Sequence, residues 1–119
     1  MAKVNRFDFG SIVIDGKQYS YDVVVLPDGT VKEREAGKAK FGGHTIGKAE
    51  IEELAKMKPE TLILGTGTDG MATLSEDGQA YAGKAKLNLV VLPSSQAIQK
   101  LNQLTGEGKR VAALIHITC

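Results

Sequence analysis

Short apolar runs separated by helix-length sequence dominate the second half of the chain. They extend from Glu60 to Leu64, from Leu87 to Leu92 and from Val111 to Ile117. Runs of this length, rich in Leu, Ile and Val, are typical of buried parallel strands joined by crossover connections. The pattern therefore predicts a parallel sheet, and the ligands of such sheets bind outside the carboxyl ends of the strands.

The first third of the chain has the pattern of β-hairpins. Two β-rich runs, Phe7 to Ile14 and Gln18 to Leu26, meet at Asp15-Gly16, which is the strongest short indication of a hairpin turn. A further turn is predicted where Pro, Asp and Gly follow one another at positions 27–29. We therefore expect an antiparallel β meander at the N-terminus.

Three features qualify this meander. The apolar phase of the first run shifts at Gly10, which predicts a bulge or a close backbone approach. Val31 to Glu35 is so highly charged that we expect an edge strand or a solvated ribbon. Ala36 to His44 has many glycines and lysines and no periodicity, so we expect a loop there.

The remaining segments have the pattern of helices. A helix is predicted for Gly47 to Met57, with Thr45 as its N-cap and Pro59 preventing its continuation. Glycines interrupt the next stretch, Thr68 to Lys86, for which we expect only a short helix near Ser75 to Tyr81.

The last helix has the clearest pattern. Ser94 or Ser95 is expected to cap it, and Gly106 stands where the C′ residue should lie. Its predicted apolar face consists of Ala97, Ile98, Leu101 and Leu104.

These elements predict a single α/β domain over residues 1–119. Its expected architecture is an N-terminal antiparallel β meander followed by alternating α and β elements, with a mixed central sheet and flanking helices. A chain of 119 residues buries enough surface for a core without disulfides or a metal.

Charge and composition exclude several classes of function. The 15 basic and 14 acidic residues are interspersed and give a net charge of +1, so we expect no nucleic-acid binding. No apolar stretch reaches the length of a membrane span, and the start of the chain has no apolar leader segment. The single cysteine, Cys119, allows no internal disulfide. We therefore expect a soluble cytoplasmic protein that does not bind membranes.

Near matches to nucleotide-binding motifs do not fulfil their structural requirements. Gly65 to Gly70 fits G-x-G-x-x-G after a strand, but no helix opens at the third glycine and no acidic residue ends the next strand. Gly42 to Lys48 and Gly78 to Lys84 fit G-x-x-x-x-G-K, but alanine follows each one where a phosphate loop needs Ser or Thr. We therefore expect no nucleotide cofactor.

The potential metal ligands are equally sparse. His44, His116 and Cys119 are the only histidines and cysteine, and none of their spacings is that of a metal site. A histidine inside an apolar strand, such as His116, is more often a hydrogen-bonded core residue than a catalyst. Strand alternation places His116 and Thr118 on one face.

Small and polar residues follow each of the three predicted parallel strands. If these strands are neighbours, the residues surround one crevice where helix amides favour an anion. The alternative is that they only form turns and caps. The candidate crevice consists of Gly65, Thr66, Gly67, Pro93, Ser94, Ser95, His116 and Thr118, with His44 and Arg34 as accessory residues.

Three segments carry a family resemblance. They are Ile63 to Gly67, Val90 to Ser94 with the helix that follows, and Arg110 to Cys119. Their order and spacing resemble a small domain family of unknown function, shared by prokaryotic hypothetical proteins, the mitochondrial NADH dehydrogenase (complex I) assembly factor and the adipogenesis-associated domain protein. The chain departs from it in having no tryptophan near Lys40-Phe41 and in the glycines of Glu76 to Lys86.

The resemblance implies a compact α/β domain with a mixed sheet, and it implies no activity. Its eukaryotic members are known as assembly or regulatory factors. Two hypotheses follow for this chain. The first is a non-catalytic module that binds a protein partner and is itself a monomer or weak homodimer. The second is an enzyme or small-anion-binding protein that uses the strand-end crevice, with Thr66, Ser94 and Thr118 as donors and His116 as an acid or base.

Overall fold

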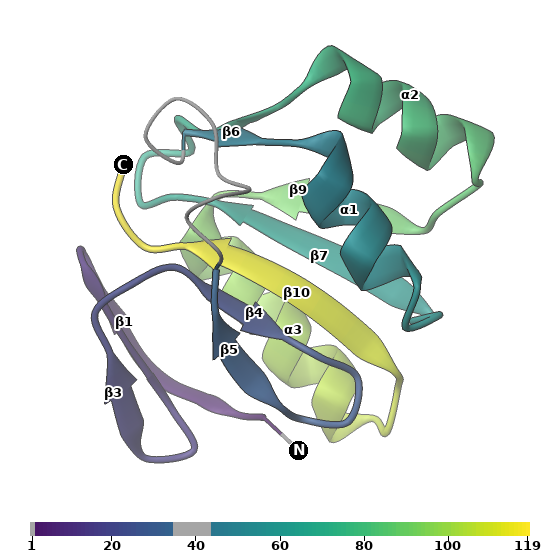
Figure 1. The fold of residues 1–119 in the computed structure, drawn as a ribbon. Helices are drawn as coiled ribbons and strands as arrows, with labels where there is room; N and C mark the ends of the chain where they lie inside the picture. The colour runs from purple at the N-terminus through teal and green to yellow at the C-terminus, as the bar shows by residue number, and fades with distance from the viewer. Residues whose placement is uncertain (1, 35–43) are drawn as a thin grey trace.

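The computed structural model describes residues 2–34 and 44–119, which form ten strands and three helices (Figure 1). The strands are β1 (Val4–Asp8), β2 (Ser11–Ile14), β3 (Lys17–Tyr19), β4 (Val23–Val25), β5 (Val31–Glu33), β6 (Thr45–Ile46), β7 (Thr61–Thr66), β8 (Thr73–Leu74), β9 (Leu89–Leu92) and β10 (Val111–His116). The helices are α1 (Lys48–Ala55), α2 (Glu76–Lys84) and α3 (Ser94–Gly106). None of these helices is long and apolar enough to cross a membrane.

A five-stranded mixed sheet forms the centre of the molecule, in the order β5-β4-β10-β7-β9. The strands β10, β7 and β9 are parallel, whereas β4 is antiparallel to β10 and β5 is antiparallel to β4. The predicted α/β fold with a mixed central sheet is confirmed. The three apolar runs are indeed neighbouring parallel strands, and their carboxyl ends meet at one edge.

Helices cover both faces of this sheet, with α1 on one face and α3 on the other (Figure 1). All residues of β7 and β10 are therefore buried, and successive side chains go to opposite cores. Ala112 and Leu114 pack in the core under α1, whereas Ala113 and Ile115 pack in the core under α3.

The N-terminal strands form a separate antiparallel sheet, β1-β2-β3, which packs into the α3 core through Ile12 and Ile14. The predicted turn at Asp15-Gly16 is present, and both residues have positive φ (50° and 82°), as a two-residue hairpin turn requires.

Two predictions about these strands are wrong. Phe7 to Ile14 is not one bulged strand, because Gly10 adopts a φ of 77° and makes the turn between β1 and β2. The alternative, a close backbone approach at Gly10, is confirmed, because its amide donates to the carbonyl of Ile117 at 2.7 Å. Gln18 to Leu26 is likewise divided, since β3 belongs to the N-terminal sheet and β4 to the central sheet. The apolar pattern continues across the boundary because both sheets pack against the same core.

The predicted helix caps also need correction. Gly47, not Thr45, is the N-cap of α1, and its amide donates to Oε1 of Glu50 at 3.2 Å. Pro93 is the N-cap of α3, so Ser94 is already helical. Gly106 is the last residue of α3, and Gly108, with a φ of 78°, is the residue that turns the chain. The predicted apolar face of α3 is confirmed, because Ala97, Ile98 and Leu101 are buried and Leu104 packs half-buried against the same core.

The glycine-rich stretch after β7 is more regular than its sequence indicates. The helix α2 runs nine residues, with Ser75 as its N-cap, and packs beside α1 (Figure 1). The two-residue strands β6 and β8 pair in parallel and were not predicted. Strands this short have no detectable alternation, which explains why they were missed.

The two edges of the central sheet differ in composition. One edge is β5, where Lys32 and Glu33 are exposed, so the prediction of a charged edge strand is confirmed for Val31–Glu33. It is wrong for Arg34, which is buried, and Glu35 lies outside the described residues. The other edge is β9, whose sequence Leu-Val-Val-Leu has no charge. The predicted loop from Ala36 to His44 lies outside the described residues, apart from His44.

Candidate functional site

The carboxyl ends of β7, β9 and β10 meet around Ser94, whose side chain is completely buried. Its hydroxyl accepts a hydrogen bond from the amide of Gly67 at 2.8 Å and donates one to the carbonyl of His116 at 2.6 Å. The amide of Ser94 in turn donates to the carbonyl of Gly67 at 2.9 Å. Gly67, Ser94 and His116 are thus connected by the protein's own hydrogen bonds.

Two glycines of the G-x-G-x-x-G match permit this close approach. A Cβ atom on Gly65 would lie 2.9 Å from the Ser94 hydroxyl and 3.3 Å from the Cβ of Ala97, so the start of α3 packs directly on β7. Gly67 has a φ of 108°, and a Cβ there would lie 2.6 Å from the backbone of Cys119. Both glycines therefore have structural roles in close packing.

The other residues of the candidate crevice surround this point. The Thr66 hydroxyl donates to the carbonyl of Leu92 at 3.1 Å, and the amide of Thr68 donates to the carbonyl of Thr118 at 2.7 Å. Pro93 is half-buried, and Ser95 is exposed on the first turn of α3. The structure thus brings Gly67, Ser94 and the backbone carbonyl of His116 together, whereas the His116 side chain makes its contact with Asp22 elsewhere.

A second cluster, which we call the ionic chain, extends from α1 to β10 through Glu50, Arg34, Asp22 and His116. The guanidinium of Arg34 binds both carboxylate oxygens of Glu50, at 2.6 and 2.8 Å. Arg34 also binds Oδ2 of Asp22 at 3.0 Å, and that oxygen lies 2.8 Å from Nδ1 of His116. The side chains of Arg34 and His116 are only 2% and 3% exposed, so the ionic chain runs through the interior of the protein.

Buried hydrogen bonds control the ionisation of this chain. Burial by itself raises the pKa of the Asp22 carboxyl, but hydrogen bonds from His116 and from the amide of Ile117 lower the pKa by more, so the net shift is downward. Burial likewise lowers the pKa of Arg34, whereas its hydrogen bonds and charge interaction with Glu50 raise that pKa above its ordinary value. Asp22 and Arg34 are therefore both charged at neutral pH.

The hydrogen-bond order at His116 follows from these charges. A carboxylate only accepts hydrogen bonds, so Nδ1 of His116 carries the proton that faces Asp22. In the neutral imidazole, Nε2 then accepts from the Thr118 hydroxyl, 3.2 Å away. The ring of His44 packs edge-on against that of His116, with 5.3 Å between the centroids. Thr118, His116 and Asp22 thus have the order of nucleophile, base and orienting carboxylate.

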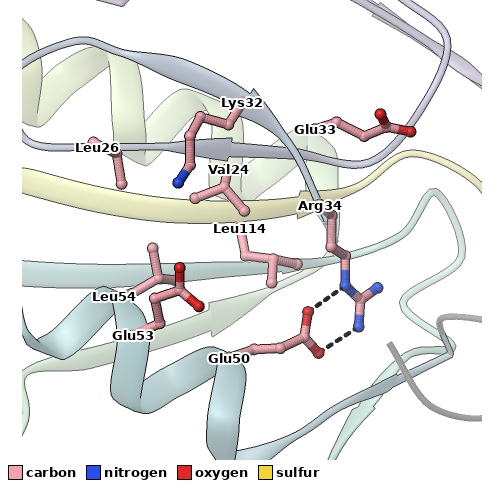
Figure 2. Close-up of a pocket in the computed structure, with 9 residues that line it drawn as sticks. All are labelled: Val24, Leu26, Lys32, Glu33, Arg34, Glu50, Glu53, Leu54 and Leu114. Atoms are coloured by element: carbon pink, nitrogen blue, oxygen red, sulfur yellow. Dashed lines mark hydrogen bonds and ion pairs between the residues drawn. The ribbon is translucent and has the colours of Figure 1, made fainter. Parts of the chain in front are cut away.

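A cavity of about 40 Å³ adjoins the ion pair of Arg34 and Glu50, between α1 and the β4-β5 edge (Figure 2). Lys32, Glu33 and Glu53 are also among its lining residues, with apolar side chains from β4, β10 and α1. A space of this size holds a few water molecules, whereas substrate pockets of several hundred Å³ are usual. Within residues 2–34 and 44–119, no group of three or more His, Cys, Asp or Glu residues could hold a metal ion.

A much wider apolar groove of about 600 Å³ runs beside β9, between that strand, β8 and α2. We call it the β9 groove, and its lining residues are Ala72, Thr73, Leu74, Gln79, Ala82, Gly83, Leu87, Leu89 and Val91. Val91 is 41% exposed there although it belongs to the central sheet. None of the lining residues is charged.

The sequence did not identify Asp22 and Glu50 as site residues, whereas it did include Arg34 and His116. One indication of Glu50 was available, because it lies four positions before Leu54, on the apolar stripe of α1. A carboxylate on such a stripe needs a buried partner. Asp22 had no comparable indication, since it lies between elements.

Comparisons with known proteins agree with the resemblance detected in the sequence. Residues 4–116 match a family described as "Protein of unknown function (DUF498/DUF598)". The solved structure of MT938 is similar at 34% identity, with a TM-score of 0.83 and 100% of both chains covered. The conserved hypothetical protein PH1505 from Pyrococcus horikoshii OT3 is similar at 32% identity, with a TM-score of 0.85, over 98% of this chain and 99% of that one.

A more distant similarity shows the fold alone. A protein from Bordetella pertussis, described as a Mth938-like domain, is 18% identical, with a TM-score of 0.69 over 98% of this chain and 85% of that chain. The family match covers nearly the whole of this chain. The protein therefore belongs to the DUF498/DUF598 family of proteins of unknown function.

Proposed function

We propose that this protein is a non-catalytic protein-binding or assembly module and that its binding surface is the β9 groove. The observation that carries this proposal is the composition of the β9 edge. Natural sheets protect their edges with charged residues or prolines, or cover them, because an open strand pairs with other chains. The edge strand β5 has Lys32 and Glu33, whereas β9 has no charged residue and borders an apolar groove.

The polar clusters give less support to a binding role. In the ionic chain, Arg34 and Glu50 satisfy each other's charges, and the adjoining cavity has the volume of a few water molecules. Within the described residues, no buried side-chain nitrogen or oxygen lacks a hydrogen-bond partner. A buried group that still needed a ligand would be unsatisfied. The β9 groove is therefore the better candidate for a partner.

The proposal is tested by comparing the proteins that tagged wild-type protein and the tagged Val91→Lys variant retain from cell extract. Lysine at position 91 places a charge on the exposed edge of β9, which opposes burial against another chain. We expect tagged wild-type protein to retain a defined protein from cell extract and Val91→Lys to lose it. Gln99→Lys is the matched control, because it adds the same charge at an exposed position of α3, outside the residues that line the groove.

The capture experiment has a clear negative outcome. If Val91→Lys retains the same proteins as the wild type, or if nothing is retained above background by either, the β9 groove is not the binding surface. We place the module in the cytoplasm, because a chain with a single cysteine forms no internal disulfide and needs no oxidising compartment. Its balanced charges favour no strongly charged partner, and we propose that it is a monomer or weak homodimer.

The arrangement of Thr118, His116 and Asp22 favours a second candidate function, an enzyme or small-anion-binding protein. Thermal-shift measurements with phosphates, carboxylates and nucleotides test it. A ligand at 100 times its Kd stabilises the native state by about 2.7 kcal/mol, which raises the Tm of a chain of this size by about 10 °C. Thr118→Ser keeps the hydroxyl and should keep the shift, whereas Thr118→Val should lose it. Absence of a shift with every anion class excludes this candidate.

A further inference from the structure

Building on the proposed function, we infer that the β9 groove binds an extended segment of a partner protein. The residues of this segment that enter the groove are uncharged, and the segment ends in an acidic residue. The segment adds to β9 as an antiparallel strand. Its alternate side chains enter the groove, and its acidic residue lies beside Lys86. Three observations carry this inference: the direction of the backbone groups of β9, the shape of the groove and the charge of Lys86 beside one of its ends.

The backbone groups of β9 face alternately toward β7 and away from it. The carbonyl of Asn88 accepts from the amide of Leu62 in β7, and the carbonyl of Leu92 accepts from the Thr66 hydroxyl. Because successive residues of a strand turn their N–H and C=O groups to opposite sides, Val90 also faces β7. Leu89 and Val91 therefore direct both their N–H and their C=O groups outward, toward the open side of the sheet.

The side chains of the groove match a strand in this position. Leu87, Leu89 and Val91 line the groove from one side at every second residue, and Ala82 and Gly83 of α2 line it from another. A Cβ on Gly83 would meet no atom within 4 Å, so the wall has open space at this point. In an antiparallel pair, residues opposite Leu89 and Val91 point to the same face. Every second residue of the segment therefore enters an apolar, uncharged groove.

The charge beside one end of the groove gives the segment a direction. Lys86 is exposed on the connection that enters β9, directly before Leu87, which lines the groove. An antiparallel segment has its carboxyl end beside this connection, and antiparallel pairs are slightly more stable per residue than parallel ones. An Asp or Glu at the carboxyl end therefore complements Lys86, whereas a basic residue there would be repelled.

A synthetic peptide tests the inference even before a partner is identified. The probe is Val-Thr-Val-Thr-Val-Asp, acetylated and amidated, in which Asp lies opposite Lys86 and the valines face the groove. At about 1 mM peptide, we expect chemical-shift changes at the amides of Leu89 and Val91. Their hydrogen exchange should slow by about tenfold, whereas Val90, whose amide faces β7, should not change. A peptide with Lys in place of Asp should bind more weakly.

Two leucine substitutions at helix glycines supply matched variants. The Cβ position of Gly83 is free of contacts within 4 Å, so Gly83→Leu places a side chain in the groove wall and should abolish the peptide-induced shifts. Gly106 in α3 also has nothing within 4 Å of its Cβ position and does not line the groove. Gly106→Leu should therefore leave the shifts unchanged. Both variants should remain folded, as their amide spectra will show.

Several results would overturn the inference. One is exchange of the Leu89 and Val91 amides as slow as that of Val90 in the free protein, because the edge would then be closed. Others are the absence of any shift at about 1 mM peptide, or equal binding by Gly83→Leu and the wild type. If the peptide fails but capture from extract still depends on Val91, the proposed function stands and only the extended-strand mode is wrong. If capture is also independent of Val91, both fail.

Discussion

At the scale of single residues, burial divides the polar groups into those that hold the fold and those available for binding. Ser94, His116 and Arg34 are all less than a tenth exposed, and each bonds to groups from other elements. Their contacts join β10 to α3 and to the chain segments before β4 and after β5. Replacing such residues should change stability more than binding.

Among substitutions that remove a single charge, we expect those that break the ion pair between Arg34 and Glu50 to lower the free energy of unfolding most. Glu50→Gln leaves a buried guanidinium with an incomplete set of charged partners, and breaking a buried pair in this way costs about 3 kcal/mol. Chemical denaturation measures the change in the free energy of unfolding. Glu52→Gln on the same helix, at a half-exposed position, should cost less than about 0.5 kcal/mol. Equal costs for the two variants would contradict the importance of the pair.

Acid should destabilise the protein through Asp22. Because the folded-state pKa of Asp22 lies below its ordinary value of 3.8, its contribution to stability is complete above that value and is lost as the pH falls through the folded pKa. Denaturation curves measured between about pH 5 and pH 2 should therefore show declining stability, and Asp22→Asn should flatten the decline. Asp28, whose pKa is also lowered, is present in the wild type and in Asp22→Asn, so it accounts for part of the pH dependence of stability that remains in the variant. An unchanged slope in Asp22→Asn would refute the assignment.

Adjacent serines distinguish structural from functional roles at the strand ends. Ser94→Ala leaves the buried amide of Gly67 and the carbonyl of His116 without their partner, which should cost about 1–3 kcal/mol of unfolding free energy. Ser95→Ala, at an exposed position one residue later, should change stability by less than about 0.5 kcal/mol. If Ser94→Ala is as stable as the wild type, the hydrogen bonds around Ser94 do not contribute to folding.

At the scale of elements, the sequence predicted the long apolar strands and α3 well, since their periodicity reflects burial that the fold does provide. The elements that it missed have other causes. The strands β6 and β8 are too short to alternate, and the division between β3 and β4 is invisible because both pack against one core. The strand-end cluster followed from topology alone. The ionic chain could not be predicted from topology, because Asp22 and Glu50 contact Arg34 only through tertiary packing.

The glycines of α2 explain why its length was underestimated, and they give a paired prediction. A Cβ on Gly78 would lie 2.9 Å from the Ser75 hydroxyl and 3.0 Å from Ile51, whereas Gly83 has open space. Gly83→Ala should therefore stabilise the protein by up to about 1 kcal/mol through helix propensity. Gly78→Ala should destabilise it, because Ser75 and Ile51 must move. Thermal denaturation of both variants measures these shifts, and a stabilised Gly78→Ala would contradict the close packing of α2 on α1.

At the scale of the whole molecule, the two hydrophobic cores share their central strands. The core under α1 and the core under α3 receive alternate residues of the same β7 and β10 strands. Loosening one face therefore releases side chains on the other, and neither core can persist alone. The N-terminal sheet is joined to this unit as well, since Asn102 of α3 bonds both the amide and the carbonyl of Val4, at 2.9 Å each.

This sharing predicts that residues 1–119 unfold as one cooperative domain. Calorimetry should show a single transition with equal calorimetric and van't Hoff enthalpies, of about 80 kcal/mol near 60 °C for a chain of this length. Leu54→Ala removes a buried side chain from the α1 core, and Ile12→Ala removes one where the N-terminal sheet meets the other core. Each should cost about 2–5 kcal/mol and should lower the Tm of the same transition without dividing it. Two separate transitions in Ile12→Ala would instead mean that the N-terminal sheet unfolds independently of the central sheet, which its bonds to Asn102 make unfavourable.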